Sequence, residues 1–98
     1  MPADPVKVGP NVYKVLLENN RVRVLEARVS AGAKVPMHGH PACVVYMVRD
    51  TKAKFTFPNG HSEVIDAKAG QTLFLDAMEH AVEAVPGPGA HVVIVELK

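Results

Sequence analysis

Residues 52–57 read Lys-Ala-Lys-Phe-Thr-Phe, and this strict alternation constrains the fold more than any other feature of the sequence. Successive side chains of a strand point to opposite faces of a sheet, so a period of two predicts a strand with one buried face. The turn-forming residues Pro58-Asn59-Gly60 follow, and residues 61–67 are predicted to return as the partner strand. The segment therefore predicts a β-hairpin.

Short strand-like segments separated by turn residues fill most of the remaining chain. They are residues 11–17, 21–29, 42–48, 72–75, 81–85 and 91–97. The pair Asn19-Asn20 suits a tight hairpin turn because asparagine tolerates positive φ, and Pro86-Gly87-Pro88-Gly89 separates the last two segments. No stretch of ten or more residues combines a helical period with a cap. The sequence thus predicts an all-β protein of about eight short strands, with the spacing of a sandwich or barrel.

Length and composition limit the domain organisation and the partners. The 98 residues suffice for one domain, and three prolines among residues 1–10 predict an extended N-terminal arm ahead of a domain over residues 11–98. Eleven basic against ten acidic residues give no electrostatic footprint for nucleic acid or an anionic membrane. The longest apolar run is too short to span a bilayer, no signal peptide is recognised, and Cys43 is the only cysteine. We therefore expect a cytoplasmic protein.

Two histidines two residues apart form the densest concentration of chemistry in the chain. Residues 32–40 read Gly-Ala-Lys-Val-Pro-Met-His-Gly-His, so in an extended segment His38 and His40 would aim at one point. His80 follows forty residues later and is a third candidate ligand. Three imidazoles leave positions open on a divalent transition metal, as in reactive sites. The competing interpretation is that the histidines line a polar cavity and hold no metal.

The sequence resembles a small single-domain cupin over nearly its whole length. Gly32, five residues, and then His38-x-His40 match the first part of the first cupin motif, while Gly70 and His80 bracket the second. Over its whole length the sequence is similar to the small bacterial cupins named after beta-alanine degradation. The resemblance implies a cupin-type β-barrel, that is, a double-stranded β-helix or jelly roll, with the three histidines as metal ligands.

The resemblance also has one departure with chemical consequences. The glutamate of the first cupin motif would fall at position 44 or 45, where this chain has valine. Three neutral imidazoles would leave the full dipositive charge on the metal, which favours an anionic or chelating substrate. Such sites are similar to those of cupin-type thiol dioxygenases and diketone-cleaving dioxygenases, so Fe(II) is the preferred ion, with Ni, Zn or Mn as alternatives.

This interpretation predicts a metalloenzyme that carries out an oxygen-dependent oxidation of a small metabolite. A non-catalytic module that binds a small molecule or metal is the main alternative. A metal-assisted isomerase or lyase is another, and it would need a nearby acid or base. Glu79 and Glu26 are the weak candidates for that role, although Glu79 should face away from His80 and Glu26 could instead pair with a surface cation.

The remaining candidates follow from strand parity. Val44 and Tyr46 share a face and are predicted to line the pocket, whereas Cys43 should point away from the metal into the core. His61, beside the Asn59-Gly60 turn, is expected to be exposed, and His91 could line the cavity or lie at an edge.

Oligomeric state is predicted from the edges of the sheets. An exposed edge strand invites pairing with another chain, and small cupins commonly dimerise through such an edge. We therefore expect a homodimer, with the proline-rich arm of residues 1–10 available to cross to the neighbouring subunit.

Overall fold

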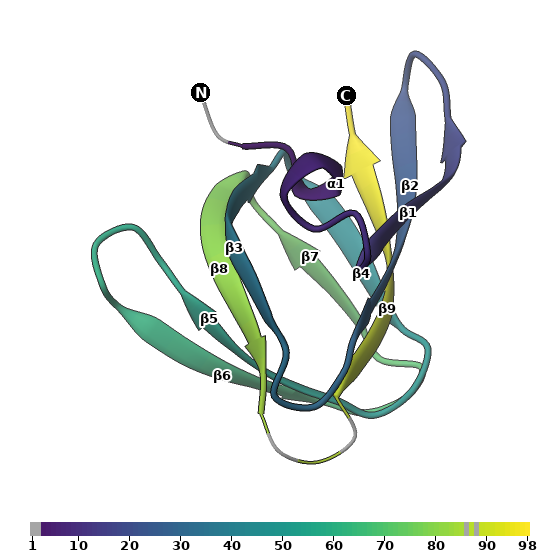
Figure 1. Ribbon diagram of the computed structural model, residues 1–98. Coiled ribbons are helices and arrows are strands. Elements are labelled where there is room, and N and C mark those ends of the chain that lie inside the picture. Colours follow the sequence, from purple (N-terminus) through teal and green to yellow (C-terminus); the bar gives the residue numbers. More distant parts are fainter. Residues whose placement is uncertain (1–2, 86, 88) are drawn as a thin grey trace.

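Two antiparallel sheets that face each other make up the fold (Figure 1). The computed structural model describes residues 3–85, 87 and 89–98, so the predictions for Met1, Pro2, Pro86 and Pro88 lie outside the described residues. The described elements are α1 (Pro5–Val8), β1 (Tyr13–Glu18), β2 (Val22–Val29), β3 (Lys34–His40), β4 (Cys43–Met47), β5 (Thr51–Thr56), β6 (Ser62–Ala67), β7 (Thr72–Leu75), β8 (Met78–Ala84) and β9 (Ala90–Leu97).

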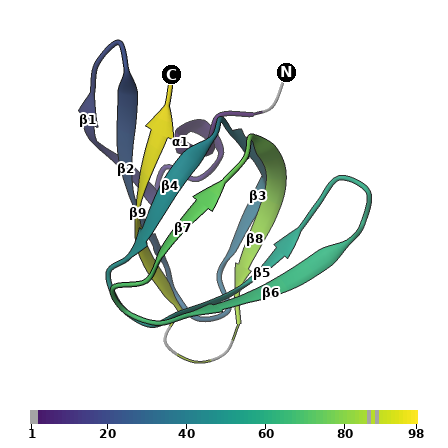
Figure 2. The same cartoon turned by 180° about the vertical axis from the view of Figure 1, so that it is seen from behind.

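The strand order confirms the all-β jelly-roll prediction and corrects one detail of it. One sheet has the order β1-β2-β9-β4-β7 and the other the order β3-β8-β5-β6, which Figure 2 shows from behind. The sequence predicts a barrel, but the described strands form two separate sheets rather than one closed sheet. The architecture is therefore a pair of sheets with a shared interior.

The predicted hairpins form, although one of them does so for a different reason. Phe55 pairs with Glu63 in the β5–β6 hairpin that the alternation predicts. In the β1–β2 turn the Asn19 side-chain oxygen accepts hydrogen bonds from the backbone N–H groups of Arg21 and Val22, at 2.8 and 2.9 Å. No non-glycine residue in the described part has positive φ. Asn19 therefore stabilises the turn by hydrogen bonding and not by a left-handed conformation.

The sequence predicts an extended N-terminal arm over residues 1–10, but this arm is not extended throughout. Residues 5–8 form a single helical turn because Asp4 accepts a hydrogen bond from the Val6 N–H at 2.9 Å and Pro5 follows it at the first helical position. The Gly39 N–H donates to the carbonyl of Ala3 at 2.8 Å. The start of the chain is thus attached to β3, the strand that carries His38 and His40.

The two glycines of the cupin-like motifs lie in turns that require their conformation. Gly32 has φ +80° and precedes β3, and Gly70 has φ +85° and precedes β7. Residues with a Cβ atom rarely adopt these angles, so each position favours glycine. These turns set where the two following strands begin.

The core lies between the sheets and leaves room for a small cavity. Its fully buried side chains include Leu25, Val35 and Cys43, which come from β2, β3 and β4. The inner side chains enclose a cavity of about 70 Å³ that His40 and His80 also line. No helix among residues 3–85, 87 and 89–98 is long and apolar enough to cross a membrane.

Candidate metal centre

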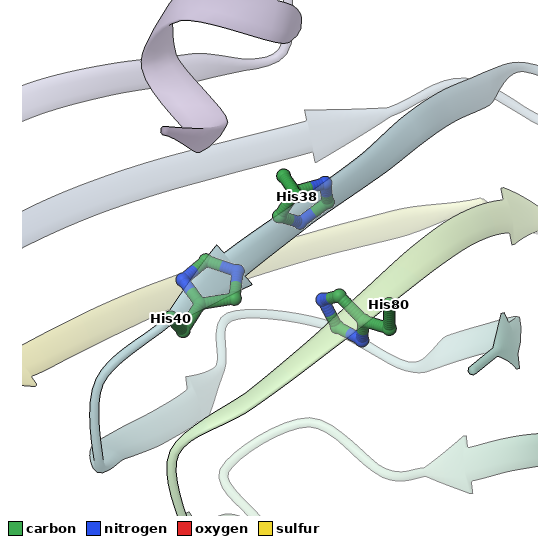
Figure 3. Close-up of side chains that lie close together, drawn as sticks. All are labelled: His38, His40 and His80. Atoms are coloured by element: carbon green, nitrogen blue, oxygen red, sulfur yellow. The ribbon is translucent and has the colours of Figure 1, made fainter. Parts of the chain in front are cut away.

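Two neighbouring strands bring His38, His40 and His80 together (Figure 3). The first two lie two residues apart on β3, and His38 pairs directly with His80 of β8 in the ladder. A register shift between Val35 and His38 allows both of these residues to face the interior although they are three positions apart. The bulge therefore decides which face of β3 receives the two histidines.

The three rings are close together and almost completely buried. Ring centroids lie 4.9 Å apart for His38 and His40, 4.7 Å for His38 and His80, and 5.3 Å for His40 and His80. One ring nitrogen of each lies within 4.8 Å of one from each of the others. Their exposed fractions are 0%, 6% and 3% for His38, His40 and His80. The described residues thus contain a buried group of three imidazoles that could hold a metal ion.

His38 is oriented by two hydrogen bonds. Its Nδ1 lies 2.8 Å from the carbonyl oxygen of Pro36, which can only accept, so Nδ1 carries the proton. The Tyr13 hydroxyl then donates to Nε2 across 3.1 Å. Burial is the main cause that lowers the pKa of His38. The ring is therefore neutral near pH 7, with its lone pair on Nε2.

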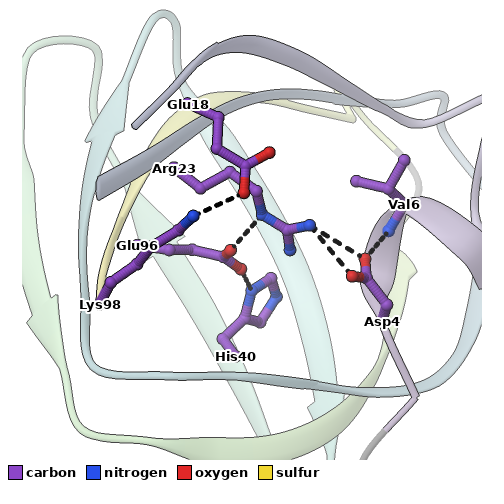
Figure 4. Close-up of polar contacts among 7 residues, drawn as sticks. All are labelled: Asp4, Val6, Glu18, Arg23, His40, Glu96 and Lys98. Carbon is purple, nitrogen blue, oxygen red and sulfur yellow. Dashed lines mark hydrogen bonds and ion pairs between the residues drawn. The ribbon is translucent and has the colours of Figure 1, made fainter. Parts of the chain in front are cut away.

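His40 is oriented by a carboxylate from another strand (Figure 4). Nδ1 of His40 donates to Glu96 of β9 at 2.7 Å, and the other carboxylate oxygen of Glu96 accepts from Nε of Arg23 at 2.7 Å. Arg23 also donates to Asp4 at 3.0 Å. A chain of polar contacts thus runs from the N-terminal segment to His40 and leaves Nε2 of His40 available.

This chain of contacts keeps Glu96 ionised inside the protein. Burial alone would raise the pKa of Glu96, but hydrogen bonds from His40 and Arg23 outweigh it and lower the pKa. Arg23 likewise lowers the pKa of Asp4 against the opposing effect of burial. Carboxylates that accept a hydrogen bond from a metal-binding histidine fix the orientation of its ring and raise its basicity. Glu96 therefore has the position of a supporting group for a metal ligand.

His80 differs from the other two histidines because no described protein group hydrogen-bonds to either of its ring nitrogens. Burial, reinforced by the proximity of His38 and His40, lowers its pKa to about 3. A buried polar group without a partner costs free energy, so such groups usually have a functional explanation. A metal ion held by a nitrogen of His80 would supply the missing partner, and the neutral, lone-pair-bearing rings fit this role.

We expect the metal-free protein to lose stability as the pH falls below about 6.5. The folded-state pKa of His80, about 3, lies below the value of about 6.5 in an unfolded chain. The unfolded state therefore takes up the proton first, and the stability present above pH 6.5 declines as the pH falls toward 3. Between pH 6.5 and 5, protonation of this histidine in the unfolded chain should lower the free energy of unfolding by about 2 kcal/mol. Urea unfolding with a chelator present, at pH 7.5, 6.5 and 5, measures the loss.

The matched variant for this pH prediction is His80→Leu. It should show a smaller dependence of unfolding free energy on pH over the same range, because the substitution removes the titrating ring. Equal slopes for the two proteins would contradict the prediction.

The cavity beside the histidines is apolar. No lysine, arginine, aspartate or glutamate of the described chain lines it, and Thr51 and Tyr13 are its hydroxyl-bearing members. Phe55 lies against His80 with ring centroids 4.4 Å apart, and Met47 and Ile94 line the wall. A ligand entering this space would meet mostly hydrocarbon.

The prediction that Val44 and Tyr46 line the pocket is wrong. Neither lines the cavity, and the Tyr46 side chain is 48% exposed. Cys43, Val45 and Met47 face the interior instead, because β4 has the opposite parity from the one predicted. Cys43 therefore points toward the site and not away from it, and burial raises the pKa of its thiol to about 11. It is a buried, unreactive thiol.

The weak catalytic candidates do not reach the histidines. Glu79 is exposed, which agrees with the expected solvated carboxylate. Glu26 accepts from Arg28 at 3.2 Å and is paired with Nε2 of His91 at 2.8 Å, so it forms the predicted type of surface pair. His61 is exposed as predicted. His91 joins the Glu26 pair and does not line the cavity.

Sequence reasoning missed the residues that support the three histidines. They are Asp4, Tyr13, Arg23 and Glu96. A signal for Glu96 was present, because it continues the buried face of Ile94 on an otherwise apolar strand. A charged residue with core parity indicates a buried polar contact, although its partner cannot be predicted from the sequence.

Comparison with solved structures shows that the fold is that of cupins. No protein-family model matches the chain, and no curated protein matches it either. A cupin domain protein of Bordetella pertussis superposes with a TM-score of 0.78 at 26% identity, covering 89% of this chain and 92% of that one. An RmlC-like cupin of Desulfovibrio desulfuricans gives 0.62 at 20% identity, covering 88% and 80%. Bacillus subtilis oxalate decarboxylase, studied for its Mn(II) centres, gives 0.59 at 20% identity, covering 80% of this chain but 21% of that protein.

Proposed function

We propose that this small cupin binds one divalent transition metal through His38, His40 and His80 and oxidises a small chelating molecule with dioxygen as the oxidant. The observation that carries the proposal is the convergence of three buried imidazoles, one of which has no protein partner for either nitrogen. Buried polar groups left without partners in a fold of this size point to a ligand. The cupin fold agrees with it.

The choice of metal rests on the donor set. Three neutral imidazoles suit Fe(II), Ni, Zn and Mn, and we propose Fe(II) first because it combines open coordination positions with oxygen chemistry. A metal held there would act as a Lewis acid for a chelating ligand and would leave its charge uncompensated by any carboxylate ligand.

The residues of this chain orient the ligands and keep water away. The carbonyl of Pro36 accepts a hydrogen bond from Nδ1–H of His38, and the carboxylate of Glu96 accepts one from Nδ1–H of His40. Nε2 of each ring can therefore face the ion. Burial raises the pKa of Tyr13, so its hydroxyl stays protonated. With Nε2 of His38 on a metal, the Tyr13 hydroxyl would no longer donate to that nitrogen and would be free to donate to an oxygen of the substrate.

The cavity favours a substrate with a chelating head and a short apolar remainder. A volume of about 70 Å³ admits only a few heavy atoms in the present side-chain conformation. No lysine or arginine among its described lining residues would pair with an anion, so the negative charge of a substrate would be compensated by the metal. Short 2-oxo acids, 2-hydroxy acids and diketones with aliphatic substituents satisfy both conditions.

Oxygen consumption by the Fe(II)-loaded protein tests this proposal. The protein is loaded anaerobically and mixed with each candidate substrate, and an oxygen electrode records uptake against substrate consumed. We expect turnover with at least one compact chelating acid or diketone and none with the His80→Leu variant. Stoichiometric metal binding without uptake for any candidate would favour the non-catalytic binding module.

The isomerase or lyase alternative has less support, because it requires an acid or base near the metal. Glu26 and Glu79 are remote from the three histidines, and Glu96 is engaged by His40 and Arg23. For the cell, we propose a reducing cytoplasmic compartment, in which the buried thiol of Cys43 stays reduced.

A further inference from the structure

We infer that the N-terminal segment, residues 3–9, is a working part of the metal centre, in which Asp4 and Arg23 are positioning residues for the ligand His40. Two separate contacts connect this segment to β3. One holds the backbone of the strand, and the other runs through side chains to the ring of His40. The inference rests on the metal site proposed above, but it does not depend on the oxidation proposed for that site.

The first contact holds the backbone between the two histidines of β3. Among the described strands, β3 is at the edge of its sheet, so only β8 pairs with it. The N–H of Gly39, which separates His38 from His40, donates to the carbonyl of Ala3 at 2.8 Å. The helical turn α1 packs against the same strand, and its Pro5 is fully buried. The N-terminal segment therefore pairs an edge that would otherwise be open at the point where the ligands lie.

The second contact reaches the ring of His40 through side chains (Figure 4). Asp4 accepts from Nη1 of Arg23 at 3.0 Å, and Nε of Arg23 donates to Glu96 at 2.7 Å. The other oxygen of Glu96 accepts from Nδ1 of His40 at 2.7 Å. A guanidinium is planar and its donors point in fixed directions. By holding one side of Arg23, Asp4 therefore also fixes the angle at which Arg23 meets Glu96.

Asp4 also affects how strongly Glu96 acts on His40. The positive charge of Arg23 is shared between two carboxylates. The Glu96 side chain is 3% exposed, and charges buried to this extent are screened only weakly. Without the charge of Asp4, Arg23 would neutralise more of the Glu96 charge, and Glu96 would be a weaker acceptor for Nδ1–H of His40. A weaker acceptor lowers the basicity of the ring and thus its affinity for a metal.

Glu18 provides an internal comparison for Asp4. It is the direct partner of Arg23 in the β1–β2 ladder, but its carboxylate accepts from Lys98 at 2.7 Å. No hydrogen bond or ion pair of the described residues continues from this exposed pair to His40. Asp4 and Glu18 therefore place similar charges near Arg23, and only the charge of Asp4 is connected to the metal site.

The Zn(II) affinity of the intact chain, measured by competition with a chromogenic chelator, tests the inference. Asp4→Asn removes the charge but keeps an oxygen for the Val6 N–H, and Asp4 is 35% exposed, so the variant should fold. Loss of a group bonded directly to a ligand costs about 10–100-fold, and Asp4 lies further out, so we expect affinity to fall about 3–10-fold. The matched control, Glu18→Gln, should bind Zn(II) like the wild type.

A second substitution tests whether Asp4 acts through Arg23. Arg23→Lys keeps the charge but not the planar arrangement of donors, so it should weaken Zn(II) binding at least as much as Asp4→Asn. Adding Asp4→Asn to Arg23→Lys should weaken binding no further, because the path to Glu96 is already broken. Losses that simply add would contradict a path through Arg23.

A spectroscopic measurement on the metal-free protein separates positioning from a general loss of stability. Nδ1–H of His40 donates to the Glu96 carboxylate, whereas Nδ1–H of His38 donates to the Pro36 carbonyl. In nitrogen-correlated NMR spectra of the isotope-labelled protein, Asp4→Asn should shift the proton resonance of His40 and leave that of His38 in place. A loss of stability in a protein that stays folded would move neither resonance.

Two kinds of failure can be told apart in these experiments. An unchanged His40 resonance, or unchanged Zn(II) affinity, in the Asp4→Asn protein would overturn the inference while the wild type still binds metal. A wild type that binds no Zn(II) would overturn the ligand set proposed above, and the inference with it.

Discussion

Replacing His80 with leucine is expected to abolish metal binding and to raise the free energy of unfolding of the metal-free protein. The two ring nitrogens of His80 are buried and have no described protein partner, so leucine removes a polar group that costs about 1–3 kcal/mol. Leucine also fills a similar volume. Loss of a group that only supports a ligand lowers metal affinity about 10–100-fold, and loss of the ligand His80 should lower it by more. Calorimetric titration with Zn(II), Ni(II) and anaerobic Fe(II), and urea unfolding in chelator, measure the two effects.

The opposite signs of these two effects distinguish a metal ligand from a structural histidine. A histidine that serves only packing would destabilise the protein when replaced and would leave metal binding unchanged. His61→Leu is the matched control, because His61 is exposed and lies outside the group of three. It should leave both quantities near the wild-type values. Metal bound stoichiometrically and tightly by His80→Leu would contradict the proposed ligand set.

Alternation predicted the strands where only one face is buried. Residues 52–56 form most of β5, which begins at Thr51 and ends before Phe57. Lys52 and Lys54 lie outside and Ala53 inside, because water and core select different side chains. The turn at Pro58-Asn59-Gly60 then fixes the partner strand, since short hairpins leave little choice of register. Hairpin contacts close in sequence could thus be predicted from local chemistry.

The inward face of β4 could not be predicted, because the strand is apolar on both faces. Cys43, Val44, Val45 and Tyr46 all have apolar side-chain bodies, so the strand shows no polar face to mark the outside. If one residue of such a strand is assigned to the wrong face, every other residue of the strand is assigned wrongly as well. This is why Val44 and Tyr46 were expected inside and Cys43 outside. A strand that is apolar on both faces needs the register of its neighbours.

The candidate ligands were predictable but their supports were not. His38 and His40 share a face because of their spacing alone, whereas the contact between His40 and Glu96 joins residues 56 positions apart. That contact depends on which strands become neighbours and on how the two sheets face each other. The bulge between Val35 and His38 also leaves no clear sequence signal.

Replacing Glu96 is expected to separate support of the metal site from stability of the fold. Glu96→Ala would leave the guanidinium of Arg23 and Nδ1–H of His40 without their buried partner, so the free energy of unfolding should fall by about 3–5 kcal/mol. Glu96→Gln keeps an oxygen that can accept from His40 but removes the negative charge. It should therefore fold with a smaller loss and bind metal about 10–100-fold more weakly than the wild type.

Competition with a chromogenic chelator measures the affinity of the Glu96→Gln protein, and urea unfolding in excess chelator measures its stability without metal. Glu79→Gln is the matched control, because this exposed carboxylate lies one residue from His80 but faces away from the site. If the loss of negative charge near the site were the cause, both variants would bind metal equally weakly. A specific hydrogen bond to His40 would weaken only Glu96→Gln, and unchanged affinity in that variant would show that Glu96 serves the fold and not the metal site.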